Sequence, residues 1–195
     1  MTYNLTPNKI LKMPIKLLTS EQTGLVVVDI QTKLMKVMRQ KERVADNTLK
    51  LIHMAKLFDI PIVVTEQYPK MIGPTLPEIN EALPDTTAIK KTEFNCCDVD
   101  PFMQALKSDG LINVILTGVE SHICVLQTCL DLLDKGYIVH VPRDAVDSRT
   151  EENWLMSLNL MEKAGAVITS TETVIFQILK KAGTKEFKEM LRLIK

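Results

Sequence analysis

The sequence lacks an excess of charge of either sign. Its 195 residues include 24 Lys and Arg and 24 Asp and Glu, so the formal net charge is zero. Binding to nucleic acids or to anionic membrane surfaces draws on an excess of Lys and Arg. The charge balance therefore argues against both kinds of partner and is typical of a neutral globular domain.

Long apolar runs are also missing. No stretch reaches the roughly 20 apolar residues that a membrane-spanning helix requires. The N-terminal stretch MTYNLTPNKILKMPIKLL (1–18) holds two short apolar patches but neither the hydrophobic core nor the small-residue cleavage site of a signal peptide. We therefore expect a cytoplasmic protein without a membrane partner.

Cysteine and histidine are scarce, and their spacing excludes common metal and disulfide frameworks. No CxxC is present, and the adjacent pair Cys96-Cys97 is not typical of a disulfide scaffold in a chain of this length. The three histidines are far apart, without the spacing of zinc ligands. Reduced thiols are expected at Cys96, Cys97, Cys124 and Cys129.

What the sequence does contain is a regular alternation of strand and helix patterns. Without a repeat, linker or low-complexity segment, we expect residues 1–195 to form a single domain. Continuous apolar runs predict strands buried on both faces, and the segments between them have helical periodicity or helix caps. Strands are expected at 24–30, 61–67, 87–94, 112–118, 137–142 and 166–171, and helices at 43–60, 100–110, 121–136, 150–165, 170–183 and 185–195.

This alternation predicts a three-layer α/β/α, Rossmann-like domain with a central, mostly parallel six-stranded sheet. A Pro-rich stretch at 68–87 is expected to be a loop. Ligands of such sheets bind outside the carboxyl ends of the strands, so reactive side chains are sought there.

Three reactive residue types fall at these ends: Asp29, Lys91 and Cys124. A helix N-terminus and a nearby ammonium both favour the thiolate, and a carboxylate can take the thiol proton and return it. Each residue also has a plainer interpretation. Asp29 could simply end a buried strand, Lys90 and Lys91 could be a solvated pair, and Cys124 could be a small buried hydrophobe.

A resemblance to a known family favours the chemical interpretation. The segments VVVDIQ (26–31), KKTEF (90–94), TGVESHICVLQTCLDLLDKGY (117–137) and VPRDAVDSR (141–149) are similar, in order, to those of the isochorismatase-like cysteine hydrolases. The similarity spans about residues 20–180, which would form the core of the domain. VTEQYPKMIGPTLPEI (64–79) resembles the subgroup of isochorismatase-domain proteins.

The resemblance implies a role for each of these residues. Cys124 would be the nucleophile, Asp29 the general base and acid, and Lys91 the group that lowers the thiol pKa and orients the pair. The Val119–Glu120 peptide would be cis, with the backbone N–H groups of Glu120 and Cys124 directed at an oxyanion. The implied reaction is hydrolysis of a C–N amide bond of a small molecule through a Cys thioester.

The same resemblance implies what surrounds the reacting groups. The histidines that follow the second strand in metal-dependent nicotinamidases are replaced by Glu66-Gln67-Tyr68, so neither a metal nor another cofactor is expected. His122 could face the substrate or cap the helix, and Cys129 is expected in the core. Candidate substrate-binding residues are Gln31, Gln67, Tyr68 and Phe94.

Two other classes of function stay open. One is a catalytically silent binding or scaffold protein that keeps this fold. The other is a redox-responsive protein that pairs Cys124 with Cys96 or Cys97. The resemblance also implies a homo-oligomer, with MLRLIK (190–195) and the N-terminal apolar patches as candidate contacts.

Overall fold

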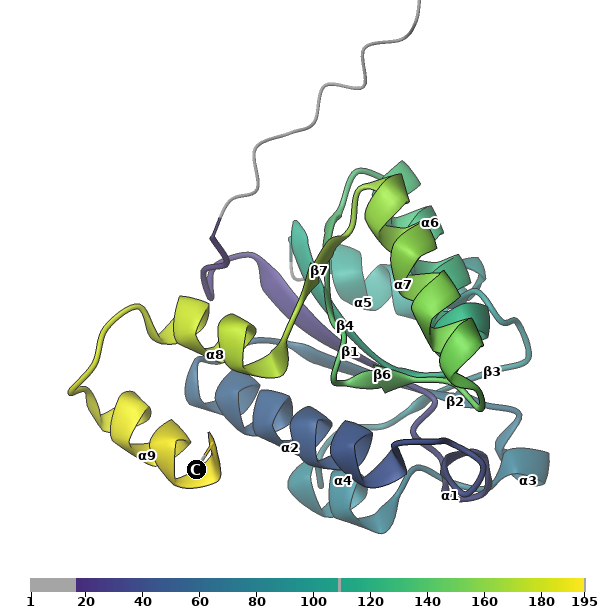
Figure 1. Cartoon of the computed structure of the whole chain (residues 1–195), viewed down its shortest axis with the longest axis horizontal. Helices are drawn as coiled ribbons and strands as arrows, with labels where there is room; N and C mark the ends of the chain where they lie inside the picture. Colours follow the sequence, from purple (N-terminus) through teal and green to yellow (C-terminus); the bar gives the residue numbers. More distant parts are fainter. Residues whose placement is uncertain (1–16, 109, 195) are drawn as a thin grey trace, which may run out of the picture.

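The computed structural model describes residues 17–108 and 110–194, and Figure 1 shows them as a sheet between two layers of helices. The predicted N-terminal apolar patches lie largely outside the described residues. Within the described part, no helix combines the length and the apolar character that crossing a membrane requires.

The central sheet is parallel throughout and has seven strands in the order β3-β2-β1-β4-β5-β7, with β6 paired to β4. Six of them match the predicted runs: β1 (Thr23–Val28), β2 (Ile62–Gln67), β3 (Ile89–Lys91), β4 (Asn113–Val119), β5 (Ile138–Pro142) and β7 (Val167–Thr169). The seventh, β6 (Val146–Asp147), was not predicted because a two-residue strand has no periodicity to detect.

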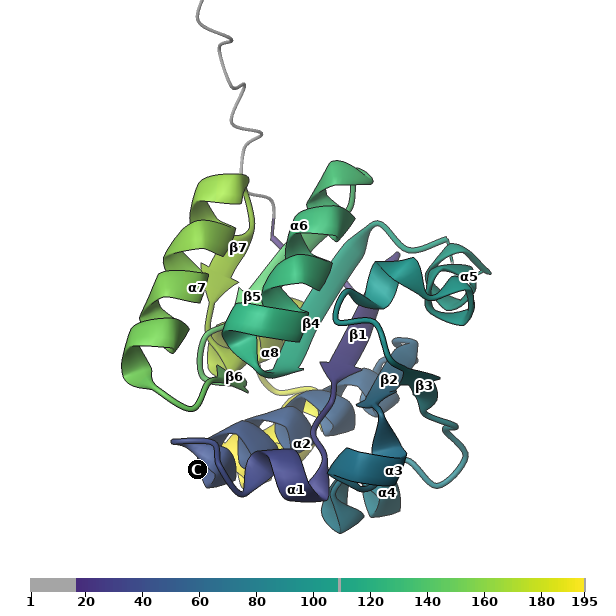
Figure 2. The same ribbon diagram turned by 90° about the vertical axis from the view of Figure 1, so that its right-hand side faces the viewer.

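Helices cover both faces of the sheet, as Figure 2 shows from the side. One layer comprises α5 (Asp100–Ser108), α6 (Leu126–Asp134) and α7 (Glu151–Ala164). The other comprises α2 (Lys41–Leu57), α8 (Thr171–Leu179) and α9 (Lys185–Ile194), with the short α1 (Thr32–Met35) and α4 (Pro77–Ala82) beside them. The three-layer prediction is therefore confirmed.

Alternate residues of the buried strands supply the two halves of the core. Leu25 and Val27 of β1 pack with α2 and α8, whereas Val26 and Val28 pack with α5, α6 and α7. All six residues of β1 are buried, which is why this strand shows no polar alternation in the sequence.

The predicted helix caps at α7 and α8 are present. The Thr150 hydroxyl accepts from the N–H of Asn153, and the Ser170 hydroxyl accepts from the N–H of Thr173. Gly165 ends α7 with a φ of 113°, a left-handed conformation that glycine adopts without steric cost. These local hydrogen bonds explain why the ends of α7 and the start of α8 could be predicted closely.

The stretch 68–87 is more ordered than the loop expected from its prolines. It contains α3 (Pro69–Ile72) and α4, each with proline in its first turn, where a missing N–H costs no helical hydrogen bond. Gln31 and Thr75 form an isolated antiparallel bridge that ties this stretch to the end of β1.

Candidate functional site

The candidate site lies where the strand order reverses direction, between β1 and β4. The chain runs from β1 to β2 and β3 on one side, and from β4 to β5 and β7 on the other. The crevice outside the carboxyl ends of two such strands is where open α/β sheets bind ligands. Asp29 directly follows β1, and the turn that leads to Cys124 directly follows β4.

Asp29 and Lys91 form a buried ion pair. The ammonium Nζ of Lys91 lies 2.7 Å from Oδ2 of Asp29, and the hydroxyl of Thr65 donates to Oδ1 at 2.7 Å. Lys91 also donates to Oε1 of Gln67 at 2.6 Å. Both oxygens of the carboxylate are therefore held in place, as a positioned proton acceptor requires.

The charge state of Lys91 follows from this arrangement. Burial lowers the pKa of Lys91, but the negative charge of Asp29 and the neighbouring thiols Cys96 and Cys124 raise it by more, so the pKa lies above its ordinary value. Lys91 is consequently an ammonium at neutral pH, in contrast to the solvated surface lysine of the plainer interpretation.

Cys124 is 5% exposed, and its thiol borders this pair. Burial, above all, and the Asp29 carboxylate raise the pKa of Cys124, while Lys91 lowers it by less. Lys91 thus acts on the pKa in the direction that the resemblance implies, but burial and Asp29 outweigh it. The resting residue is thus a protonated thiol beside a carboxylate, so a base has to remove its proton during the attack.

The turn before Cys124 has the expected backbone. The Val119–Glu120 peptide is cis, and Gly118 has a φ of 117°. A Cβ at Gly118 would lie 2.0 Å from the carbonyl oxygen of Val28, so only glycine allows β4 to approach β1 this closely. The two strand ends that carry Asp29 and Cys124 are thereby brought together.

Cys124 lies in a π-helical turn, Ser121–Val125, instead of the first turn of an α-helix. The N–H of Val125 donates to the carbonyl of Glu120 at 3.3 Å, five residues earlier, and α6 begins only at Leu126. Single π-helical turns inside helices occur frequently at functional sites. This turn could not be predicted, because its residues fit an ordinary helical pattern.

Two residues that follow β6, Ser148 and Arg149, form hydrogen bonds with residues of this turn. Arg149 donates from Nε and from its backbone N–H to Oε2 of Glu120, at 3.0 and 3.1 Å. The Ser148 hydroxyl lies 2.5 Å from that of Ser121 and 2.8 Å from Nδ1 of His122. Sequence reasoning assigned no role to Ser148 or Arg149, although both lie in the VPRDAVDSR segment.

The predicted substrate-binding residues fall into two groups. Gln31 and Gln67 are buried, and their amides join parts of the chain: Gln31 bonds to the backbone of Gln67 and Gly73, and Gln67 donates to the carbonyl of Thr92. Tyr68 and Phe94 are 49% and 54% exposed. Gln31 and Gln67 therefore position the chain around the site, whereas Tyr68 and Phe94 remain candidates for contact with a substrate.

The other cysteines differ in their relation to the site. Cys96 is fully buried, its Sγ lies 4.0 Å from the Thr65 hydroxyl, and it interacts electrostatically with Cys124. Burial raises the pKa of Cys96 to about 11 and that of Cys97 to about 12. Cys97 contacts the carbonyl of Thr128 instead, so the structure favours Cys96 over Cys97 as a redox partner.

Cys129 is buried in the α6 layer, as expected. All four cysteines are unpaired. Among the described residues, no three His, Cys, Asp or Glu side chains gather as a metal site would need. Several hollows of the described surface lie away from Cys124, and one of about 640 Å³ is lined by Leu17, Phe176 and Lys180.

Comparison with known proteins places this geometry in a family. The family model of the isochorismatase domain matches residues 23–173. The chain is 42% identical over 176 residues to the secreted isochorismatase effector Isc1 of Phytophthora sojae, covering 88% of this chain and 83% of the relative. It is 34% identical over 176 residues to isochorismatase domain-containing protein 2 of Rattus norvegicus, covering 90% and 82%.

A solved structure shows the same fold. The structure of MAR1 ribonuclease from Caenorhabditis elegans superposes with a TM-score of 0.86 at 38% identity, and the match covers 92% of each chain. One of these relatives is named a secreted effector and another a ribonuclease. Their names therefore agree on the family but not on a substrate. The chain belongs to the isochorismatase family, in agreement with the resemblance seen in its sequence.

Proposed function

We propose that the protein is a cysteine hydrolase that cleaves a C–N, amide-type bond of a small molecule. The observation that carries this proposal is the buried ion pair of Asp29 and Lys91 beside the buried thiol of Cys124. A cysteine hydrolase needs a thiol as nucleophile and a base within reach of its proton, and a fixed positive charge nearby stabilises the sulfur as it attacks.

In the proposed reaction, the Asp29 carboxylate takes the proton of the Cys124 thiol as the sulfur attacks the carbonyl carbon. The Lys91 ammonium stabilises the sulfur charge that develops and keeps the carboxylate in place. When the tetrahedral intermediate collapses, Asp29 returns the proton to the leaving nitrogen, and a thioester remains on Cys124. A water molecule, deprotonated by Asp29, then attacks the thioester and releases the acid and the thiol.

The burial of Cys124 bears on the size of the substrate. With 5% of the residue exposed, a small carbonyl compound fits the site better than a segment of a polymer. The expectation of a small-molecule substrate follows from this limited access. Because one relative is named a ribonuclease, an RNA oligonucleotide belongs in the test as a separate substrate class.

The test is release of ammonia or amine from a panel of small primary and secondary amides, with the acyl adduct trapped by acid and located by peptide mass spectrometry. The wild type and Cys129→Ala should both turn over a member of the panel and carry the adduct on Cys124. Cys124→Ala should do neither. Cys129 is the matched control because it is a buried thiol of the same helical segment without a charged neighbour that shifts it.

A catalytically silent binding protein is the second candidate. The observation that favours it is the raised pKa of Cys124, since a buried thiol is inert unless a base activates it. Binding of an amide without turnover or adduct, by a folded wild-type protein, would support this candidate over the hydrolase. Cleavage of the RNA oligonucleotide that survives in Cys124→Ala would contradict both.

We also propose that the protein forms a homo-oligomer. Leu155, Met156 and Leu160 are exposed on α7, and apolar side chains on one helix are typical of contacts between subunits. Met190 of the predicted C-terminal contact is buried in the core, so this part of MLRLIK packs inside the subunit. Light scattering of the purified protein measures the number of subunits.

A further inference from the structure

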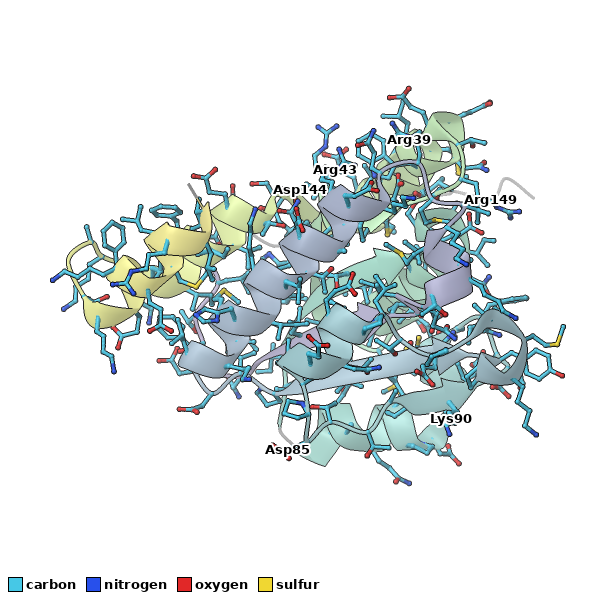
Figure 3. All side chains as sticks on the ribbon, turned by 90° about the horizontal axis from the view of Figure 1, so that it is seen from below. Arg39, Arg43, Asp85, Lys90, Asp144 and Arg149 are labelled. Atoms are coloured by element: carbon cyan, nitrogen blue, oxygen red, sulfur yellow. The ribbon has the colours of Figure 1, made fainter. Side chains whose placement is uncertain are left out.

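Three arginine side chains gather on one tryptophan, Trp154, of α7. The guanidinium carbons of Arg39, Arg43 and Arg143 lie 5.4, 5.6 and 5.0 Å from the ring centroid of Trp154. Arg39 precedes α2, Arg43 lies in its first turn, Arg143 follows β5, and Trp154 belongs to α7. Figure 3 shows Arg39 and Arg43 side by side at the start of α2.

The ring is a fixed platform for these charges. Trp154 is almost fully buried, and its indole N–H donates to the carbonyl of Arg143 at 3.2 Å. Nε of Arg39 and two nitrogens of Arg43 are buried without a hydrogen-bond acceptor, and Oδ1 of Asp147 is buried without a donor. Cation–π contacts of this kind hold a guanidinium in position and leave its outer edge free to donate.

Three carboxylates lie in this region, but the ion pairs within the described residues involve Arg39 alone of the three arginines. Asp147 and Glu151 lie 3.7 and 3.9 Å from Arg39, and Glu151 is exposed and therefore screened by solvent. Asp147 also accepts the backbone N–H of Gln40 through Oδ2.

The remaining carboxylate of this region, Asp144, accepts the N–H and the hydroxyl of Thr171 through Oδ1. Within the part of the chain that the structure describes, neither Arg43 nor Arg143 has an ion pair with a carboxylate. Buried guanidinium nitrogens of Arg39 and Arg43 therefore lack an acceptor, which a bound anion would supply.

We infer that Arg39, Arg43 and Arg143 form an anion site that takes a phosphate group, either inorganic phosphate or a phosphate monoester. Three guanidinium forks can donate to three or more oxygens of one anion, a number that a phosphate offers and a carboxylate does not. The proposed anion site makes no use of the Asp29 carboxylate or the Lys91 ammonium.

The single tryptophan of the chain makes the site directly observable. Phosphate bound by guanidinium groups that stack on Trp154 should change the intrinsic fluorescence of the protein. The protein is titrated with sodium phosphate and, in a second arm, with adenosine 5′-monophosphate. Binding of phosphate is measured by fluorescence and by calorimetry, and binding of the monophosphate by calorimetry. Sodium chloride keeps the ionic strength constant, since nonspecific screening would otherwise resemble binding.

The wild type should show a saturable fluorescence change. Arg43→Gln and Arg143→Gln should each weaken the apparent affinity by at least about tenfold, the loss expected when a charge-assisted hydrogen bond is removed. Lys163→Gln, a loss of the same charge from an exposed position of α7, should bind like the wild type. If the monoester binds more tightly than inorganic phosphate, the ligand is a phosphate ester. If the monoester binds equally or more weakly, the ligand is the free phosphate ion.

Arg143 is exposed, so Arg143→Gln tests the site even if Arg43→Gln does not fold. Circular dichroism of each variant establishes that it is folded before its titration is compared. A change that does not saturate, or the same change in wild type and a folded Arg143→Gln, would overturn the inference.

Discussion

The Lys91 ammonium lies 2.7 Å from Oδ2 of Asp29, and neither side chain is accessible to solvent. The two residues come from the ends of β1 and β3, which β2 separates in the sheet. A buried ion pair is weak evidence of stabilisation, because desolvation of both charges offsets most of their attraction. Its presence at the ligand-binding edge of the sheet is better explained by the chemistry of Cys124.

Substitution of either partner should therefore affect both activity and stability. Asp29→Asn removes the proposed base and leaves the Lys91 ammonium buried without its counter-charge. We expect a loss of kcat by a factor of roughly 10² to 10⁴ and a loss of about 3–5 kcal/mol in the free energy of unfolding. Steady-state kinetics and urea denaturation measure the two. Thr65→Val, which removes only the hydroxyl bonded to Oδ1, should lower both by less; an equal or larger effect would contradict the assignment of the base.

The reactivity of the Cys124 thiol should follow its raised pKa. Iodoacetamide should alkylate Cys124 more slowly at pH 7–8 than a free cysteine, whose pKa is about 8.5, and the rate should rise at higher pH. Since Lys91 lowers and Asp29 raises the pKa of the thiol, Lys91→Met should shift the rate profile to higher pH and Asp29→Asn to lower pH. Peptide mass spectrometry across a pH series measures the profiles. Shifts of both variants in the same direction would show that the three side chains are not coupled as the structure places them.

Much of the site was accessible from the sequence because its parts are local. Lys91 ends β3, Asp29 directly follows β1, and Cys124 lies in the turn after β4; a parallel sheet places all such ends at one edge. The strand order that brings β1 next to β4 is a tertiary property. So is the burial of Cys124, which reverses the direction of its pKa shift from the one expected of a thiol beside an ammonium.

The features that the sequence did not reveal depend on contacts between distant residues. The short strand β6 exists only because Gly118 and Val119 of β4 pair with Val146 and Asp147. The arginines on Trp154 come from positions more than 100 residues apart, and no local pattern connects them. Gln31 could be singled out by its place after β1, but its bonds to Gln67 and Gly73 required the path of the 68–87 stretch.

The role of Gln31 can be tested by separating stability from substrate affinity. Its amide donates to the carbonyls of Gln67 and Gly73 and accepts the N–H of Gln67. Gln31→Leu would leave these buried groups unpaired, at a cost of about 1–3 kcal/mol each. For Gln31→Leu we expect a lower free energy of unfolding, measured by urea denaturation, and faster proteolysis within residues 68–76. The KM should change only modestly. If Gln31 instead binds the substrate, KM should rise strongly while the free energy of unfolding changes little.

Acid should destabilise the fold through His140. Burial lowers the pKa of His140 to about 4, compared with about 6.5 in an unfolded chain. Between these two values the unfolded state binds the proton and the folded state does not, so the free energy of unfolding rises with pH across this window and falls on acidification. The shift corresponds to about 3 kcal/mol between pH 7 and pH 4.

Urea denaturation at pH 7.0, 6.0, 5.0 and 4.5 should show this slope in the wild type. It should be absent from His140→Leu, in which nothing titrates at that position of β5. His53→Gln, at a partly exposed position of α2, should keep the slope of the wild type; a slope that survives in His140→Leu would assign the acid sensitivity to other groups.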